Sequence, residues 1–176
     1  MTDVAPSRRA NKRGLATREN MITAAIASLA TGDPTAVSGN RIARDIGVTW
    51  GAIQYQFGDI DGLWAAVLRH TAELRGDLPA SAAPNGTLRE RVTGLVDTML
   101  VGLRTPESLA IETLRAALPR DVAELEREFP LTAAEFASWK PGWDDACERA
   151  FADLDVDPAR VRQMAALIPA AMRGLT

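Results

Sequence analysis

Residues 38–57 read SGNRIARDIGVTWGAIQYQF and contain the signals for two short helices in close succession. Ser38 and Thr49 are hydroxyl side chains of the kind that cap the first turn of a helix. Gly47 lies between the two segments and can take the left-handed conformation that ends a helix. The apolar residues expected on the inner faces are Ile42, Ala43 and Ile46 in the first helix, and Ile53 and Phe57 in the second.

The spacing of these two helices is compatible with two motifs. A helix-turn-helix has this arrangement, with a small residue such as Ala43 where the helices cross, because the two backbones approach closely there. An ordinary helical hairpin with a glycine turn has the same spacing. The spacing alone therefore leaves both alternatives open.

The residues upstream predict one further helix and a flexible arm. From Arg18 to Leu29 apolar residues recur at helical spacing, and Gly32, Asp33 and Pro34 end the pattern. We expect this helix to begin near Thr17, whose hydroxyl can cap it. Residues 1–16 are polar and lack apolar periodicity, so we expect a flexible basic arm there. Its basic side chains are Arg8, Arg9, Lys12 and Arg13.

The residues downstream predict helices only. A helix over about 61–75 has a buried stripe formed by Leu63, Trp64, Val67, Leu68 and Leu74. The segment 76–86 is rich in Pro, Ala and Gly and is the best linker, so we expect domains at 17–76 and 77–176. Thr87 with Glu90 matches a capping box. Further helices are expected over about 88–103, 106–118, 120–129, 132–153 with a break or kink at Pro141 and Gly142, and 158–173 with a kink at Pro169.

Composition supports an all-α fold and narrows the function classes. The chain has 176 residues, 47% of them hydrophobic and only 5% aromatic, and no segment shows strand alternation. It has one cysteine, Cys147, and one histidine, His70, so neither a disulfide nor a Cys/His zinc site can form within the chain. We therefore expect no structural metal, and we expect no cofactor. No membrane-length apolar stretch or signal peptide is present, so we expect a cytoplasmic protein.

Charge is distributed unevenly along the chain. Residues 1–60 carry seven basic and five acidic side chains, a net charge of +2, and the remainder carries 13 and 18, a net charge of −5. This division favours a nucleic-acid-facing N-terminal part and a C-terminal part that stays away from nucleic acid.

The N-terminal third resembles the DNA-binding domain of the tetracycline-repressor (TetR) family of transcriptional regulators. The resemblance spans residues 18–68 and is concentrated in the helix-turn-helix. The residues that carry it are Arg18, Ile22, Ala25, Leu29 and Gly32, followed by Ile42, Ala43, Gly47, Val48, Thr49, Gly51, Ile53, Tyr55, Phe57, Asp61 and Leu63.

The resemblance implies an all-helical homodimer that binds palindromic double-stranded operator DNA through the helix-turn-helix. It also implies a C-terminal ligand-binding and dimerisation domain that releases the DNA when a small apolar or amphipathic effector binds, as in a repressor. Two positions depart from the family pattern. Ile60 replaces the usual phosphate-contacting lysine, with Asp59 beside it, and Gln54 replaces an aromatic residue.

The second helix of the motif would enter the major groove. Gln54 would read adenine through its amide. Trp50 would present an apolar edge to thymine methyl groups, or, as tryptophans usually do, pack in the core. Gly51 would allow close approach, and Tyr55 would reach a phosphate or a thymine. The full set of expected DNA contacts is Gly39, Asn40, Arg41, Thr49, Trp50, Gly51, Gln54 and Tyr55, with Arg44 as an added charge and Arg8, Arg9, Lys12 and Arg13 in an adjacent minor groove.

The C-terminal half carries weaker expectations. Met99 and Trp143 are candidates for an effector pocket, although such residues also serve as ordinary core. The chain stops at Thr176 soon after a helix end, so we expect the sequence to be truncated before a last dimerisation helix. Two other functions stay open: a helical protein-interaction module and a small helical enzyme, for which no motif supplies a nucleophile with a base.

Overall fold

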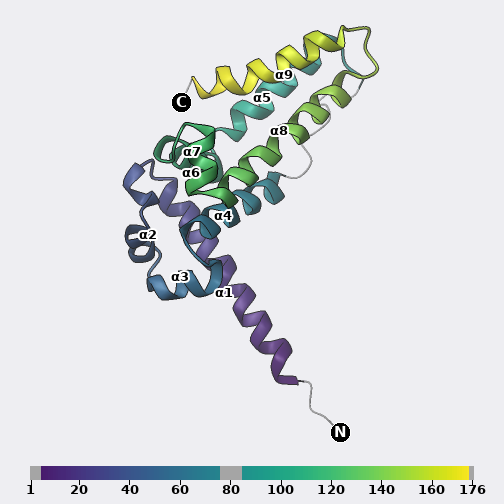
Figure 1. Ribbon diagram of the computed structural model, residues 1–176. Coiled ribbons are helices and arrows are strands. Elements are labelled where there is room, and N and C mark those ends of the chain that lie inside the picture. Colours follow the sequence, from purple (N-terminus) through teal and green to yellow (C-terminus); the bar gives the residue numbers. More distant parts are fainter. Residues whose placement is uncertain (1–4, 76–84, 175–176) are drawn as a thin grey trace. The chain divides into compact units, whose positions relative to one another are not determined.

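The computed structural model describes residues 5–75 and 85–174, and for residues 5–13, 75, 172 and 173 it describes the backbone only. All regular elements in these ranges are helical, which confirms the predicted all-α fold class (Figure 1). The elements are α1 (Ala5–Leu29), the 3-10 turn η1 (Pro34–Val37), α2 (Gly39–Asp45), α3 (Trp50–Phe57), α4 (Ile60–Arg75), α5 (Leu88–Gly102), α6 (Pro106–Ala117), α7 (Val122–Glu128), α8 (Pro130–Phe151) and α9 (Pro158–Arg173). None of these described helices is both long enough and apolar enough to cross a membrane.

The chain forms two compact units. Unit 1 comprises Met1–Thr71 with Pro106–Ala134, and unit 2 comprises Ala72–Thr105 with Glu135–Thr176. The first unit is thus larger than the predicted domain 17–76, because α6 packs against α1 and η1. The apolar side of α6, which includes Ala110, Ile111 and Leu114, is buried there. Sequence periodicity predicted α6 but not the unit to which it belongs.

The core of unit 1 contains the apolar stripes predicted for its long helices. In α1 the side chains of Ile22, Ala25 and Leu29 are buried, and in α4 those of Leu63 and Trp64 are fully enclosed. The expectation for Leu74 was wrong, since 61% of this residue is exposed. It continues the α4 spacing but lies beyond Thr71, where unit 1 ends.

The predicted start of the first helix was also wrong. Instead of a flexible arm over 1–16, the backbone is helical from Ala5, so α1 extends about three turns beyond the predicted cap at Thr17. Ala, Arg and Lys have high helix propensity, and Pro6 lies in the first turn, where its missing N–H breaks no helical hydrogen bond. Helix propensity, which needs no apolar stripe, accounts for this extension.

Unit 2 is held by an apolar cluster and a buried arginine. The cluster contains Leu95, Cys147, Phe151, Val161 and Ala165, with Trp143 and Met164 among the partly buried residues packed against it. The predicted capping box at Thr87 and Glu90 starts α5 and is confirmed.

The buried arginine of unit 2 is Arg91, which is 4% exposed and reaches the end of α8. Its guanidinium donates to the Ala150 carbonyl at 2.8 Å and to the Asp153 carboxylate at 2.7 Å. The Arg91 guanidinium holds the pKa of Asp153 below its ordinary value. These bonds link the first turn of α5 to the last turn of α8 and to Asp153, two residues beyond its end.

Cys147 is enclosed in this cluster as an inert thiol. Burial, together with the nearby Asp144 carboxylate, raises the pKa of Cys147 to about 11. The nucleophilic thiolate is therefore scarce at neutral pH.

Both prolines inside helices are accommodated without a break. Helix α8 continues through Pro141 and Gly142, so of the predicted break or kink the break was wrong, and α9 continues through Pro169. Pro169 has no N–H, so it cannot donate to the carbonyl of Ala165 one turn earlier. The indole Nε1 of Trp143 donates to that carbonyl instead, at 2.6 Å. A side chain of α8 thus replaces the backbone bond that proline removes from α9.

Because the indole hydrogen bond takes the place of the missing backbone bond, we expect an energetic coupling between Trp143 and Pro169. The Trp143→Phe variant should lose about 1–2 kcal/mol of unfolding free energy from the hydrogen bond, in addition to the lost ring volume. In a Pro169→Ala background an alanine N–H can bond Ala165, so the same change should cost less. Chemical denaturation of the wild type, the two single variants and the double variant measures the coupling. Strictly additive costs would contradict this role of the indole.

Candidate nucleic-acid interface

The turn between α2 and α3 is held by backbone hydrogen bonds to the end of α2. Gly47 has φ +71°, the left-handed conformation predicted for it, and its N–H donates to the Arg44 carbonyl at 3.1 Å. The Val48 N–H donates to the Ala43 carbonyl at 2.9 Å, which completes a Schellman motif. The motif satisfies carbonyls at the end of α2 and directs the chain immediately into α3.

Both ends of α3 are held by specific contacts. At its start the Thr49 hydroxyl accepts the Ala52 N–H at 3.2 Å, as predicted for a cap. At its end the Arg18 guanidinium of α1 donates to the Gln56 carbonyl and stacks over the Phe57 ring, 4.2 Å from its centroid. Arg18 was noted only as part of the family pattern. Its role depends on the packing of α1 against α3.

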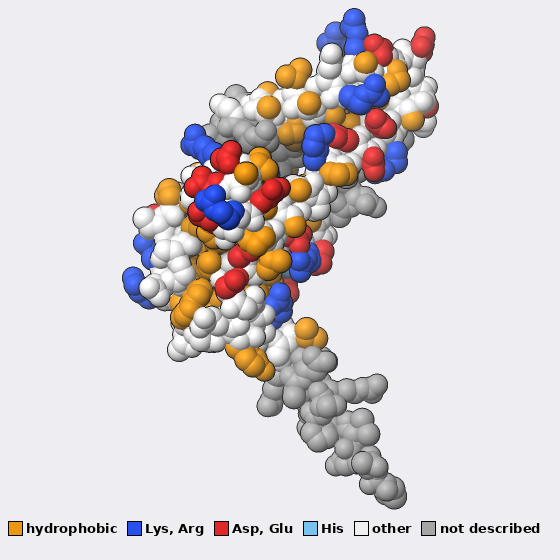
Figure 2. Space-filling view, in the orientation of Figure 1, with side chains coloured by type: hydrophobic (Ala, Val, Ile, Leu, Met, Phe, Trp, Pro, Cys, Tyr) orange, Lys and Arg blue, Asp and Glu red, His pale blue; other side chains and the backbone are white. Residues whose placement is uncertain are grey.

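The outer face of α3 is exposed and uncharged. Gly51, Gln54 and Tyr55 are exposed, with Tyr55 at 87%, while Ile53 and Phe57 are buried on the opposite face. No residue of Trp50–Phe57 is ionisable except the tyrosine phenol. The surface that Figure 2 shows in this region is mainly white and orange, in keeping with that composition. Amide, phenol and apolar groups are therefore available to a partner on this face.

Trp50 does not stand free at the start of α3. Its residue is half-buried, and its ring lies against Gly39 at the start of α2. A Cβ built on Gly39 would lie 2.8 Å from Cζ3 and 3.0 Å from Cη2 of the indole. The ring thus covers part of Gly39, another residue expected at the interface.

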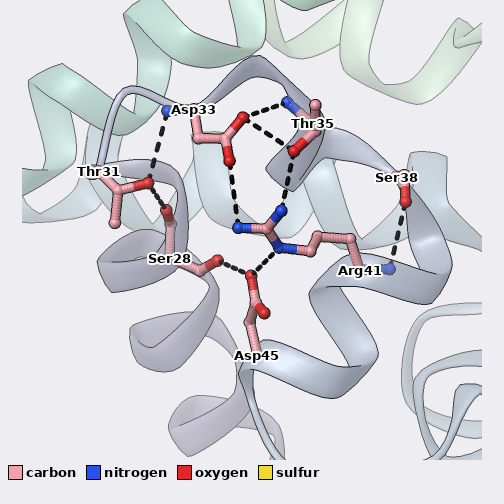
Figure 3. A network of polar contacts seen from close by, with 7 residues as sticks. All are labelled: Ser28, Thr31, Asp33, Thr35, Ser38, Arg41 and Asp45. Atoms are coloured by element: carbon pink, nitrogen blue, oxygen red, sulfur yellow. Dashed lines mark hydrogen bonds and ion pairs between the residues drawn. The ribbon is translucent and has the colours of Figure 1, made fainter.

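Arg41 is held in a polar network at the side of α2 (Figure 3). Its three guanidinium nitrogens contact three acceptors: Nε bonds Asp45 at 2.9 Å, Nη1 bonds Thr35 at 2.9 Å, and Nη2 pairs with Asp33 at 3.1 Å. Asp45 also accepts the Ser28 hydroxyl at 2.9 Å. The network ties α1, η1 and α2 together, so Arg41 has structural partners in addition to its expected DNA role.

The charges of this network are held in place by hydrogen bonds. The backbone N–H and hydroxyl of Thr35 lower the pKa of Asp33, and Arg41 adds to this effect. The Ser28 hydroxyl and then Arg41 lower the pKa of Asp45. Both carboxylates are therefore ionised at neutral pH, where Arg41 is charged as well.

The other expected contact residues are distributed as follows. Asn40, Arg44 and Thr49 are exposed on the motif. Arg8, Arg9, Lys12 and Arg13 lie on the helical backbone of α1, and their side chains fall outside the described residues.

The departure from the family pattern at Ile60 coincides with local capping. The Asp59 carboxylate, which would repel a phosphate, accepts the Gly62 N–H at 2.8 Å and so caps α4. Ile60 itself is half-buried.

Asp61 is a buried carboxylate whose structural role sequence reasoning missed. It is 5% exposed and accepts three hydrogen bonds from Leu131 and Thr132 at the start of α8. The only sequence signal was its place in the family pattern, which names no partner 70 residues away.

The two pocket candidates and the histidine of the described residues each lie against a neighbouring element or in a partly buried position. Met99 is half-buried on α5, and the Trp143 indole is engaged with α9. His70 of α4 contacts Glu19 of α1, with 3.1 Å between Nδ1 and Oε1.

Comparison with known proteins supports the fold. No model of a known protein family matches the chain, and no curated protein matches it in sequence. Among solved structures, it is similar to NalD of Pseudomonas aeruginosa, described as the secondary repressor of the MexAB-OprM multidrug efflux pump. The similarity covers 92% of this chain and 85% of NalD, with a TM-score of 0.61 and 17% sequence identity. At this level of identity the likeness shows that the two proteins share a fold.

Proposed function

We propose that this chain is a transcriptional regulator that binds palindromic operator DNA as a homodimer through α2 and α3. The observation that carries the proposal is the exposed outer face of α3, which presents Gly51, Gln54 and Tyr55 from a helix held at both ends. Such rigid presentation of hydrogen-bonding side chains is what reading base edges in a major groove requires.

The composition of this face assigns base reading and phosphate contacts to different residues. Because α3 has no basic residue, phosphate contacts would come from other groups, and base reading would come from the amide of Gln54 and the ring of Tyr55. Exposed Arg44 and the basic residues near the start of α1 are the candidates for phosphate contacts. Operator affinity would then depend on salt through residues outside α3.

The shared fold also motivates a proposal for regulation. NalD is described as a repressor, and we propose that this chain likewise represses transcription. A small apolar or amphipathic effector, bound by the C-terminal part of the chain, would release it from the operator.

Selection of bound fragments from random DNA tests the proposal. The complete chain should enrich a palindromic sequence, and small-molecule extracts should reduce that enrichment if an effector is present. A helical protein-interaction module or an enzyme would enrich no motif. Failure to enrich any sequence at low salt would therefore refute DNA recognition.

Gln54 offers the sharpest test of base reading. The Gln54→Ala variant should bind the selected operator about 1–3 kcal/mol more weakly and lose preference at one base pair in each half-site. Gln56→Ala is the matched control, since Gln56 is on the same helix but less exposed, and Arg18 binds its backbone rather than its amide. Fluorescence anisotropy with operators altered at single positions measures both effects. Equal losses for the two variants would contradict a reading role for Gln54.

A further inference from the structure

The contact between Trp50 and Gly39 joins the first turns of the two motif helices. Trp50 is the first residue of α3 and Gly39 the first of α2. Cβ atoms essentially never approach another heavy atom closer than 3.0 Å, yet one on Gly39 would lie 2.8 Å from the indole Cζ3. The ring can occupy this place only because residue 39 has no side chain.

The contact complements the turn on the other side of the motif. The end of α2 is joined to α3 through the Schellman motif at Gly47, and the start of α2 meets α3 at the Trp50 ring. Two separated points of contact restrict rotation of one helix against the other more than a single hinge does. The indole thus restrains the direction in which α3 presents its outer face.

Trp50 is less exposed than the neighbouring residues of α3 that are free to reach a partner. Gly51, Gln54 and Tyr55 are exposed, whereas Trp50 is half-buried. An indole that left Gly39 to reach a base would lose this packing and uncover the glycine. The apolar surface of the indole stays packed only while the ring lies on Gly39.

We propose that Trp50 is a positioning residue for α3: seated on Gly39, it sets the angle between α2 and α3 instead of reading a base. The inference rests on the proposed DNA-binding function. It implies that a side chain placed on residue 39 weakens DNA binding by displacing the Trp50 ring. It also implies that Gln54 and Tyr55 carry the base preference.

The test is a double-mutant cycle with Gly39→Ala and Trp50→Ala, read out by operator affinity and by base preference. Each single variant should bind the selected operator about tenfold more weakly, with base preferences unchanged at all positions. The double variant should be no weaker than Trp50→Ala alone, because the added methyl group then meets no ring. Trp50→Leu should restore part of the affinity lost in Gly39→Ala. Gly102→Ala is the control, since a Cβ there meets nothing within 4 Å, and its affinity should be unchanged.

Affinities are compared at a temperature where circular dichroism shows every variant folded, which separates positioning from simple loss of stability. Full operator affinity of folded Gly39→Ala, or an altered preference at one base pair in Trp50→Ala, would overturn the positioning role. If the complete chain enriches no DNA, the proposed function fails separately. The same cycle measured by unfolding without DNA then decides the contact, and additive unfolding free energies would overturn it.

Discussion

The Asp61→Ala variant is expected to lose about 3 kcal/mol or more of unfolding free energy. The Asp61 carboxylate accepts the Leu131 N–H at 2.8 Å, the Thr132 N–H at 2.9 Å and the Thr132 hydroxyl at 2.6 Å. Pro130 has no N–H, and the next amide along, that of Ala133, already donates to the Phe129 carbonyl. Asp61 therefore satisfies both remaining donors in the first turn of α8, and alanine would leave both without an acceptor, the Thr132 N–H in a fully buried residue.

Asp59→Ala is the matched control. Asp59 also caps a helix, but it is exposed and accepts a single N–H, so its loss should cost about 1 kcal/mol. Thr132→Val keeps the side-chain shape, removes one of the three bonds to Asp61, and should fall between the two variants. Urea denaturation of all three chains measures these costs. An Asp61→Ala cost no larger than that of Asp59→Ala would show that Asp61 does not hold the start of α8.

The Gly62→Ala variant is expected to lose about 3 kcal/mol of unfolding free energy, a loss comparable to that of Asp61→Ala. This is the opposite of the usual effect, since helices generally prefer alanine to glycine. A Cβ on Gly62 would overlap the Phe57 carbonyl oxygen and lie 3.0 Å from its carbon. These are backbone atoms at the end of α3, so relief requires moving the helix rather than rotating a side chain. Thermal unfolding measures the loss, and operator affinity should fall with it if α3 reads DNA as proposed.

Gly142→Ala, within α8, should change stability in the opposite direction. A Cβ at Gly142 meets nothing within 4 Å, so the ordinary gain of about 1 kcal/mol from replacing a helical glycine should appear. Opposite signs for the two glycine-to-alanine changes would establish that a backbone approach, and not helix propensity, accounts for Gly62. A stabilised Gly62→Ala would refute the close packing of α3 on α4.

Several helix ends in this chain could be predicted from local signals, although the cap expected at Thr17 does not start a helix. Ser38, Thr49 and the Thr87–Glu90 box each cap the helix expected from sequence, and Gly47 takes the expected left-handed conformation. Each of these signals involves residues no more than four positions apart, so the interaction partner is contained in the pattern itself. The extension of α1 to Ala5 was missed because propensity alone marks no boundary.

The exposed face of α3 was predictable from the sequence, but the surroundings of the half-buried candidate residues were not. Helical periodicity placed Gln54 and Tyr55 on the outer face of α3, where the structure has them. It gave no sign that Trp50 would rest on Gly39 or that Arg41 would bond Asp33 and Asp45. An exposed position follows from spacing, whereas the partner of a half-buried side chain depends on neighbouring elements.

By itself, the sequence determined the all-helical class, the two short helices joined at Gly47 and the face that the second of them exposes, because helix periodicity and caps act over one or two turns. Tertiary structure alone decided that α6 joins the first unit, that Asp61 caps α8, and that Trp143 serves the carbonyl left by Pro169. These pairings connect residues from 22 to 71 positions apart. Packing directions select such partners, and no local pattern along the chain encodes those directions.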